Sequence, residues 1–288
     1  MGQMAHVEAE RFVCKMRGGS QPILIQADDG EFYIVKFFVN MQGPLVVINE
    51  VLGSTIYRDA GLTVPVWRLV KITDKFLNAN PEAWFHFRDQ QLRPCSGYAF
   101  GSRLAGGGGR LRAWELLSGE MYATVSNRSQ FWPALALDIL FGQTDFRQAV
   151  FVQAGNGSLL ATFIDFGSDY RLPETWEDRQ RVLACRYSDM RVYPNLSPEI
   201  ADQVYSTLSR INVKSLERVF SSLPFAWKQG QAIERYIEIV SKIGSKECRS
   251  KAASLVLASG IGGIQPDRPA EKLRDRWNRH FTLQSLIA

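Results

Sequence analysis

The segment Leu159–Ile164 is a short, mainly apolar run. Asp165, the first residue of an Asp-Phe-Gly triplet, follows it directly. A run of this length, bounded by turn residues, is consistent with a buried strand. Residues 155–157, Gly-Asn-Gly, form a strong hairpin signal, and residues 149–153 form a second strand pattern before it. The sequence therefore predicts a buried hairpin that delivers one carboxylate to the edge of a sheet.

A second carboxylate, Asp145, lies just before this predicted hairpin. The two ends of a hairpin lie side by side, so Asp145 and Asp165 are expected near enough to share a bound ligand. One interpretation is that Asp165 holds a metal-phosphate. The other is that an Asp-x-Gly sequence after a strand is only ordinary turn chemistry. The rest of the chain has to decide between them.

Composition sets broad limits on the protein. The chain has 288 residues, enough for two lobes, with 45% hydrophobic residues and a net charge of +5. This excess of basic residues suits an anionic ligand such as a nucleotide. The Lys and Arg residues do not form a continuous stripe of the kind that would indicate binding of nucleic acid. The four Cys residues are scattered and there are only three His residues, which argues against a zinc site or a His-based triad.

Nothing in the sequence is typical of a membrane protein or a secreted one. The first twelve residues contain acids and no long apolar core, so we expect no signal peptide. No apolar stretch approaches the length of a membrane span. We therefore expect a cytoplasmic location and neither membrane nor nucleic-acid binding.

The N-terminal residues are dominated by strand patterns. Alternation of apolar and polar residues predicts successive strands, at 7–16, Ile23–Ala27, 31–39, 66–72 and 97–102. The loop between the first two strands contains Gly18, Gly19 and Ser20. Such a loop can bring backbone N–H groups against a phosphate, although it can equally be a plain hairpin turn.

Lys36 lies in a strand whose two faces are both apolar, so its ammonium group needs a carboxylate or a phosphate as a partner. The alternative is that Lys36 reaches solvent from an edge strand. A helix is predicted at 45–60, after Pro44, and Glu50 borders its apolar stripe. Glu50 is therefore the candidate partner of Lys36, unless it simply faces solvent.

The rest of the chain is mainly helical in pattern. Helices are predicted at 113–122, 128–141, 198–211, 215–223, 233–243, 246–258 and 271–281. We expect a β-rich N-terminal lobe at residues 1–102 and a larger, mainly helical lobe at residues 103–288. This organisation is α+β in class.

With these parts in order, the chain resembles the HipA-like kinases, and within them the stand-alone bacterial branch. The resemblance rests on six segments, from about Arg17 to about Trp227: RGGSQPILIQADDGEFYIVKF, NEVLGSTIYRDAGLTVP, GYAFGSR, TDFRQAVF, IDFG and LPFAW. It implies a bilobal, protein-kinase-like fold that binds ATP and Mg²⁺ between the lobes. In such a fold Gly18, Gly19 and Ser20 match the loop that covers the phosphates, Lys36 the phosphate-binding lysine, and Glu50 its ion-pair partner.

The resemblance also implies roles for residues near the hairpin. Asp145 matches the catalytic aspartate that accepts the proton of the substrate hydroxyl, and Asp165 matches the Mg²⁺ ligand. Protein kinases carry a metal-binding Asn five residues after the catalytic aspartate, where this chain has Val150. Gln148 has the same carbonyl oxygen and is the candidate replacement. The His-Arg-Asp triplet is absent, because Thr144 precedes Asp145.

The function expected from this resemblance is phosphoryl transfer from ATP to a Ser or Thr hydroxyl, on a protein. Ser20 is a candidate site of autophosphorylation, as in some HipA-like kinases. Two alternatives stay open: a lipid or small-molecule kinase on the same fold, and a pseudokinase that binds without turnover, which the missing Asn favours. The acceptor, a toxin role, the regulator and the oligomeric state are not indicated.

Overall fold

The computed structural model describes residues 6–107, 111–167, 186–228 and 245–261. The predicted helices at 233–243 and 271–281 lie outside these ranges. The strands are β1 (His6–Lys15), β2 (Ile23–Ala27), β3 (Phe32–Lys36), β4 (Trp67–Ile72), β5 (Phe85–Phe87), β6 (Gln90–Leu92), β7 (Gly97–Arg103), β8 (Ala113–Trp114), β9 (Gln148–Gln153) and β10 (Leu159–Ile164). The α-helices are α1 (Leu45–Asp59), α2 (Asp74–Ala79), α3 (Phe131–Phe141), α5 (Pro198–Ser209), α6 (Val213–Ser222) and α8 (Lys246–Ile261). Short 3₁₀ helices are η1 (Pro81–Ala83), η2 (Gly119–Thr124), η3 (Arg128–Gln130), η5 (Met190–Val192) and η6 (Phe225–Lys228).

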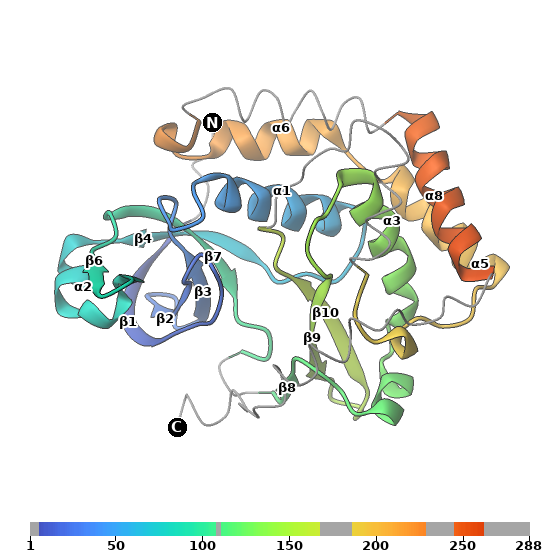
Figure 1. Cartoon of the computed structure of the whole chain (residues 1–288), viewed down its shortest axis with the longest axis horizontal. Coiled ribbons are helices and arrows are strands. Elements are labelled where there is room, and N and C mark those ends of the chain that lie inside the picture. Colours follow the sequence, from blue (N-terminus) through green and yellow to red (C-terminus); the bar gives the residue numbers. More distant parts are fainter. Residues whose placement is uncertain (1–5, 108–110, 168–185, 229–244, 262–288) are drawn as a thin grey trace.

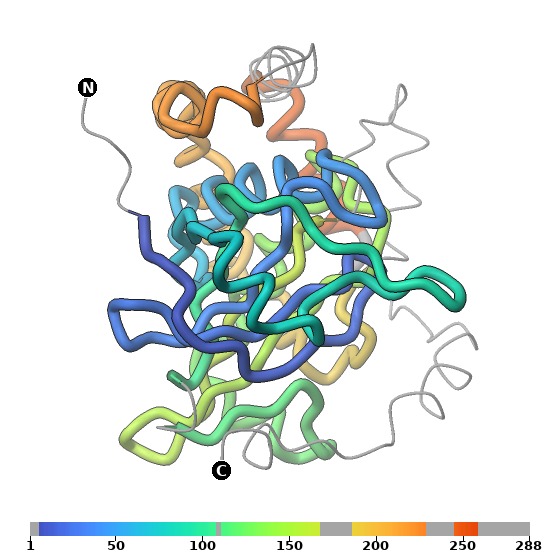
Figure 2. The backbone as a smooth tube through the Cα atoms, turned by 90° about the vertical axis from the view of Figure 1, so that its left-hand side faces the viewer, coloured from blue at the N-terminus to red at the C-terminus, as the bar shows by residue number. Residues whose placement is uncertain are grey.

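Five of the N-terminal strands close into a barrel in the order β1-β2-β3-β7-β4. β1 pairs with β2 antiparallel and with β4 parallel, and two register shifts in β1 bend it round both neighbours. Closure leaves no unpaired sheet edge. Figure 2 looks onto this barrel. Its strands confirm the predicted pattern, except that β3 ends at Lys36 instead of continuing to residue 39.

The helix α1 lies beside the barrel, between the barrel and α6 (Figure 1). Every residue from Val46 to Tyr57 is buried, including Asn49 and Glu50. A helix that is buried on all sides needs neighbours on all sides, and α1 packs on β7 and α6. The predicted helix at 45–60 is confirmed, with Pro44 at its N-cap.

The hairpin β9–β10 is antiparallel and pairs Gln148 with Ile164 and Gln153 with Leu159. It forms a three-stranded sheet in the order β10-β9-β8. Its turn contains Gly157 at φ 81°, a backbone conformation that favours glycine. The predicted hairpin is therefore confirmed, and its open end carries both Gln148 and the residue after Ile164.

The helix α3 lies at the centre of a second hydrophobic core, distinct from the one inside the barrel. All its residues, FWPALALDILF, are buried, and Asp138 is its one charged residue. The helices α5 and α8 pack against α3. The helix ends at Gly142, which has φ 71° and whose N–H donates to the Asp138 carbonyl. A helix that is apolar on every side is stable only when enclosed in this way.

One predicted helix is wrong. Residues 113–122 form β8 and the start of η2, with no α-helix. Ala113 and Trp114 pair instead with Val152 and Phe151 of β9. Ser118 and Gly119 interrupt the helical pattern, and pairing with an existing strand outweighs the weak local preference for helix. The helix predicted at 128–141 begins as the short 3₁₀ helix η3 and continues as α3.

The outer edge of β10 is covered by the segment before α3. The Asn127 side chain donates to the Ala161 carbonyl (2.9 Å) and accepts from the Ala161 N–H (2.8 Å). One amide thus replaces a neighbouring strand at this point. In the described part of the chain no helix is both long and apolar enough to cross a membrane.

We expect Asn127→Ala to lower the free energy of unfolding by about 1–3 kcal/mol, because both backbone groups of Ala161 lose their partner. Asn127→Asp retains the acceptor but places a carboxylate oxygen against the Ala161 carbonyl and the Gln130 amide oxygen, so it should cost at least as much as the alanine variant. Urea unfolding of the three proteins measures this order. An alanine variant as stable as the parent would show that water replaces Asn127 without penalty.

Candidate active site

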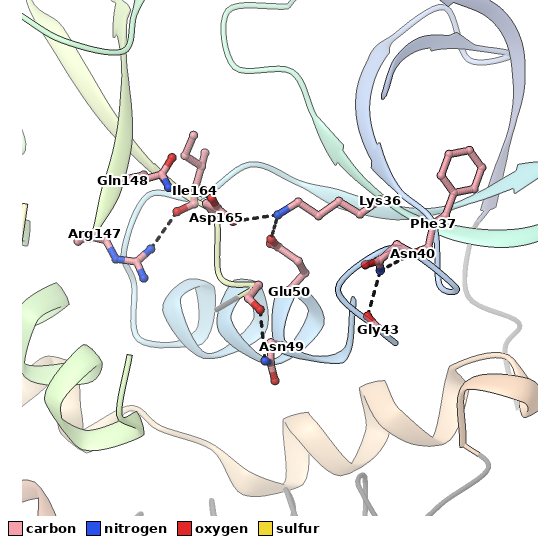
Figure 3. A network of polar contacts seen from close by, with 11 residues as sticks. Lys36, Phe37, Asn40, Gly43, Asn49, Glu50, Arg147, Gln148, Ile164 and Asp165 are labelled. Atoms are coloured by element: carbon pink, nitrogen blue, oxygen red, sulfur yellow. Dashed lines mark hydrogen bonds and ion pairs between the residues drawn. The ribbon is translucent and has the colours of Figure 1, made fainter. Parts of the chain in front are cut away.

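Lys36 is the last residue of β3, and Glu50 lies in the second turn of α1. Their side chains form an ion pair and are only 12% and 4% exposed (Figure 3). The pairing that the sequence predicted is therefore present in the structure. Because both groups are withdrawn from water, each depends on the other for compensation of its charge.

Asp165 follows β10 directly and has φ 59°, which is uncommon for a residue other than glycine. Its Oδ1 accepts from Lys36 Nζ (2.8 Å), and its Oδ2 accepts from Gln148 Nε2 (2.8 Å). Figure 3 shows Lys36 reaching across from the barrel to meet Asp165 and Glu50. The structure thus brings together four side chains from β3, α1, β9 and the end of β10.

The electrostatics of this cluster follow from one cation between two carboxylates. Burial alone would lower the pKa of Lys36, but Glu50 and Asp165 outweigh it and raise that pKa above its ordinary value. Burial likewise opposes ionisation of Asp165, and Lys36 nevertheless holds the pKa of this carboxyl below its ordinary value. Burial raises the pKa of Glu50, against the effect of Lys36. Lys36 therefore stays charged at neutral pH.

Gly167 lets the chain after Asp165 approach this cluster closely. A Cβ atom on Gly167 would lie 2.8 Å from Val46 Cγ1 and 3.1 Å from Glu50 Oε1. The Gly167 carbonyl also accepts from Asn49 Nδ2 of α1 (3.4 Å). A side chain at residue 167 would push this turn away from α1, so glycine is required by the packing.

The loop between β1 and β2 has the conformation of a glycine-dependent turn. Gly18 has φ 139° and Ser20 is only 3% exposed. A Cβ atom on Gly19 would lie 2.5 Å from Gln42 Nε2, so the loop packs closely on the segment before α1. Gln21 anchors the loop, since its amide donates to the His86 carbonyl (2.7 Å) and accepts from the His86 N–H (2.8 Å).

Asp145 is exposed, and its Oδ1 accepts from the N–H of Phe146 (2.8 Å). It lies three residues before Gln148, at the end of the hairpin where Asp165 also lies. Among the described residues no hydrogen bond joins Asp145 to Lys36 or Asp165. Its catalytic role stays a prediction.

Two observations bear on metal binding. Val150, at the position of the usual Asn, is 8% exposed within β9, so it belongs to the core of the sheet. No group of three or more His, Cys, Asp or Glu side chains in the described ranges is placed to hold a metal ion. Because the buried Glu50 carboxylate is paired with Lys36, Asp165 and the amide oxygen of Gln148 are the candidate ligands within those ranges.

A buried ion pair that lies beside the site was not identified from the sequence. Arg147 and Asp138 form an ion pair, Nε to Oδ2 3.1 Å, in which both side chains are 1% exposed. Tyr57 of α1 donates its hydroxyl to Asp138 Oδ1 (2.6 Å). The one available signal was a single acid in a helix otherwise apolar on every side, because a buried charge requires a partner.

The comparison with known families agrees with this geometry. Residues 11–112 match the HipA-like kinase family. Over these residues the match confirms the resemblance predicted from the sequence. It covers the barrel from within β1 onward, α1 and the segments between them. It ends before the hairpin, so Asp145, Gln148 and Asp165 lie outside it. No curated protein sequence matches the chain significantly.

Two solved kinase structures are similar to most of the chain. The Helicobacter pylori proinflammatory kinase CtkA aligns with 88% of this chain and 99% of its own, at 12% identity and a TM-score of 0.54. The Golgi casein kinase with Mn/ADP bound aligns with 91% of this chain and 75% of its own, at 13% identity and a TM-score of 0.50. At such identities the similarity establishes a kinase-like α+β fold and no residue roles.

We expect Lys36→Met to lower the free energy of unfolding by about 3–5 kcal/mol at pH 8, because the buried Glu50 carboxylate and Asp165 lose their shared cation. The loss should shrink at pH 5. Without Lys36 the folded state raises the carboxyl pKa, so protonation as the pH falls relieves the repulsion. Urea unfolding at the two pH values measures both effects.

The control is Lys71→Met, which removes an exposed pair with Glu8 (3.1 Å; side chains 47% and 42% exposed). It should cost less than about 1 kcal/mol at both pH values. If Lys36→Met behaves like this control, the Lys36 cluster is solvated and the electrostatic account is wrong.

Proposed function

We propose that this protein is an ATP- and Mg²⁺-dependent kinase that transfers the γ-phosphoryl group to a Ser or Thr hydroxyl of a protein. The observation that carries the proposal is Lys36, held between Glu50 of α1 and Asp165 of the Asp-Phe-Gly triplet. Phosphoryl transfer requires positioning and neutralisation of charge more than covalent chemistry, and this arrangement serves both requirements.

Lys36 would bind the α- and β-phosphates of ATP. Its ammonium group is fully charged, because two carboxylates raise its pKa. Glu50 holds it from α1, so Lys36 keeps its direction when Asp165 turns to another partner. The backbone N–H groups of Gly18, Gly19 and Ser20 would cover the phosphates, since this loop offers few side-chain atoms to block the approach.

Asp165 and Gln148 would hold Mg²⁺, which supplies neutralisation of phosphate charge when bound. The donor set fits a hard cation, because both residues have oxygen donors and the Asp165 side chain is 36% exposed. Here the Gln148 amide presents its N–H to Asp165. Turning the amide by half a rotation would present its oxygen instead, next to the same carboxylate.

Asp145 would accept the proton of the acceptor hydroxyl. As the new bond forms between the acceptor oxygen and the γ-phosphorus, the bond from that phosphorus to the β,γ-bridging oxygen breaks, and ADP leaves. An exposed carboxylate at the open end of the hairpin can meet a hydroxyl that arrives from solvent. A protein acceptor is supported by the family resemblance, and cytoplasmic location remains a prediction.

The alternative is a pseudokinase that binds nucleotide without transfer. It is favoured by Val150, whose buried apolar side chain cannot act as the second metal ligand of other kinases. In that case Gln148 would not replace the missing metal ligand. The site would bind Mn²⁺ or Mg²⁺ with ADP, but no phosphorylated product would form.

The test is transfer of labelled phosphate from ATP to a generic protein substrate, together with calorimetric binding of Mn²⁺ and ADP. We expect Asp145→Asn to lower kcat by a factor on the order of 10²–10⁴ while binding is unchanged, as for removal of a general base. Asp165→Asn should weaken metal-dependent nucleotide binding as well.

The control is Asp89→Asn, at an exposed position in the turn between β5 and β6, which should behave like the parent. Binding without transfer by the parent protein would establish the pseudokinase. Transfer that survives both site substitutions would place the active site elsewhere.

Ser20 is a poor acceptor in this conformation, because its side chain is buried and Gln21 ties the loop to His86. We expect no phosphate on Ser20 after incubation of the parent with ATP. Gln21→Ala, which releases the loop, should permit phosphorylation. Phosphopeptide mapping compares the two. Rapid modification of Ser20 in the parent would mean that the loop opens without this release.

A further inference from the structure

The buried pair Arg147–Asp138 lies at the point where β9 and β10 meet α3. Both side chains are 1% exposed, and Arg147 Nε lies 3.1 Å from Asp138 Oδ2. Two buried charges are expensive to desolvate, and an apolar pair of similar volume is often at least as stable. The contacts of the guanidinium group therefore need an explanation other than stability.

Arg147 contacts the residues on both sides of Asp165. Its Nη1 donates to the Ile164 carbonyl (2.9 Å; Figure 3), and its guanidinium carbon lies 4.8 Å from the centre of the Phe166 ring. Asp165 between them has φ 59°. An isolated residue pays an energetic cost for this conformation, and contacts that hold both neighbours can maintain it.

Asp138 and Tyr57 orient Arg147 in turn. Asp138 accepts from Arg147 through Oδ2 and from the Tyr57 hydroxyl through Oδ1 (2.6 Å). The Tyr57 ring also lies 5.3 Å from the guanidinium carbon of Arg147. Tyr57 is on α1, two turns after Glu50, and residues at this spacing share a face of a helix. α1 is thus joined to Asp165 twice, through Glu50–Lys36 and through Tyr57–Asp138–Arg147.

We propose that Arg147 is a positioning residue for Asp165, oriented by Asp138 and Tyr57. It holds the backbone on each side of Asp165, so that the carboxylate keeps the direction needed by a metal-bound nucleotide. This inference rests on the proposed function of Asp165. The alternative is that the three residues only stabilise the fold.

The deciding variant is Asp138→Leu/Arg147→Met, which replaces the buried charges with apolar groups of similar size. We expect it to fold and to unfold at a temperature close to that of the parent, because a buried pair is often replaceable in this way. We expect its affinity for Mn²⁺ with ADP to fall by about 10–100-fold, as for loss of a residue that orients a metal ligand. If the double variant does not fold, the same affinity is measured with the milder variants Tyr57→Phe and Arg147→Lys.

Hydrogen exchange provides a readout that does not depend on nucleotide. Amides at 165–167 should exchange about tenfold faster in the variants, because their segment opens more easily. The matched control is Arg103→Met, which removes an ion pair with Glu31 in the barrel (2.6 Å) and should change neither readout.

Stable variants that bind Mn²⁺ with ADP and exchange at 165–167 like the parent would overturn the inference. If the parent itself binds no Mn²⁺ with ADP, the proposed function fails, and unchanged or faster exchange at 165–167 still decides whether Arg147 holds this segment.

Discussion

One ammonium group holds together the parts of this protein that matter for its proposed chemistry. Lys36 comes from the barrel, Glu50 from the helix beside it, and Asp165 from the hairpin of the second core. Lys36 and Glu50 are withdrawn from water, and opposite charges in such a place cannot be separated cheaply. This pair therefore fixes the barrel against α1 and sets the direction in which Lys36 meets the more exposed Asp165.

The helix α1 holds Glu50 in place, because almost none of the surface of this helix is exposed to solvent. It is buried from Val46 to Tyr57, with β7 and α6 among its neighbours. Beyond it, Phe38, two residues after Lys36, stacks on Trp227 at 5.0 Å with the rings 8° from parallel. These neighbouring segments enclose the helix that carries Glu50. A charged side chain on an enclosed helix has less freedom to change its position than one on a solvated surface.

Several parts of the fold could be predicted because their signals are local. The Gly-Asn-Gly turn required a hairpin, and a lysine between two apolar strand faces required an anionic partner. Residues 113–122 were mispredicted as helix because their partner strand, β9, lies far along the chain. Arg147 was also missed, since nothing in its local sequence indicates that it is buried beside Asp138.

The sequence by itself determined most of the elements, the order of the charged residues along the chain and the presence of a buried lysine that had to be neutralised. These follow from periodicity, turn residues and the cost of burying a charge, which act over a few residues. Only the tertiary structure decided that Lys36 has two carboxylate partners instead of one, that Asp165 adopts a positive φ, and that Arg147 holds its neighbours. Those outcomes depend on which distant surfaces meet, and contacts between remote segments leave no periodic trace in either of them.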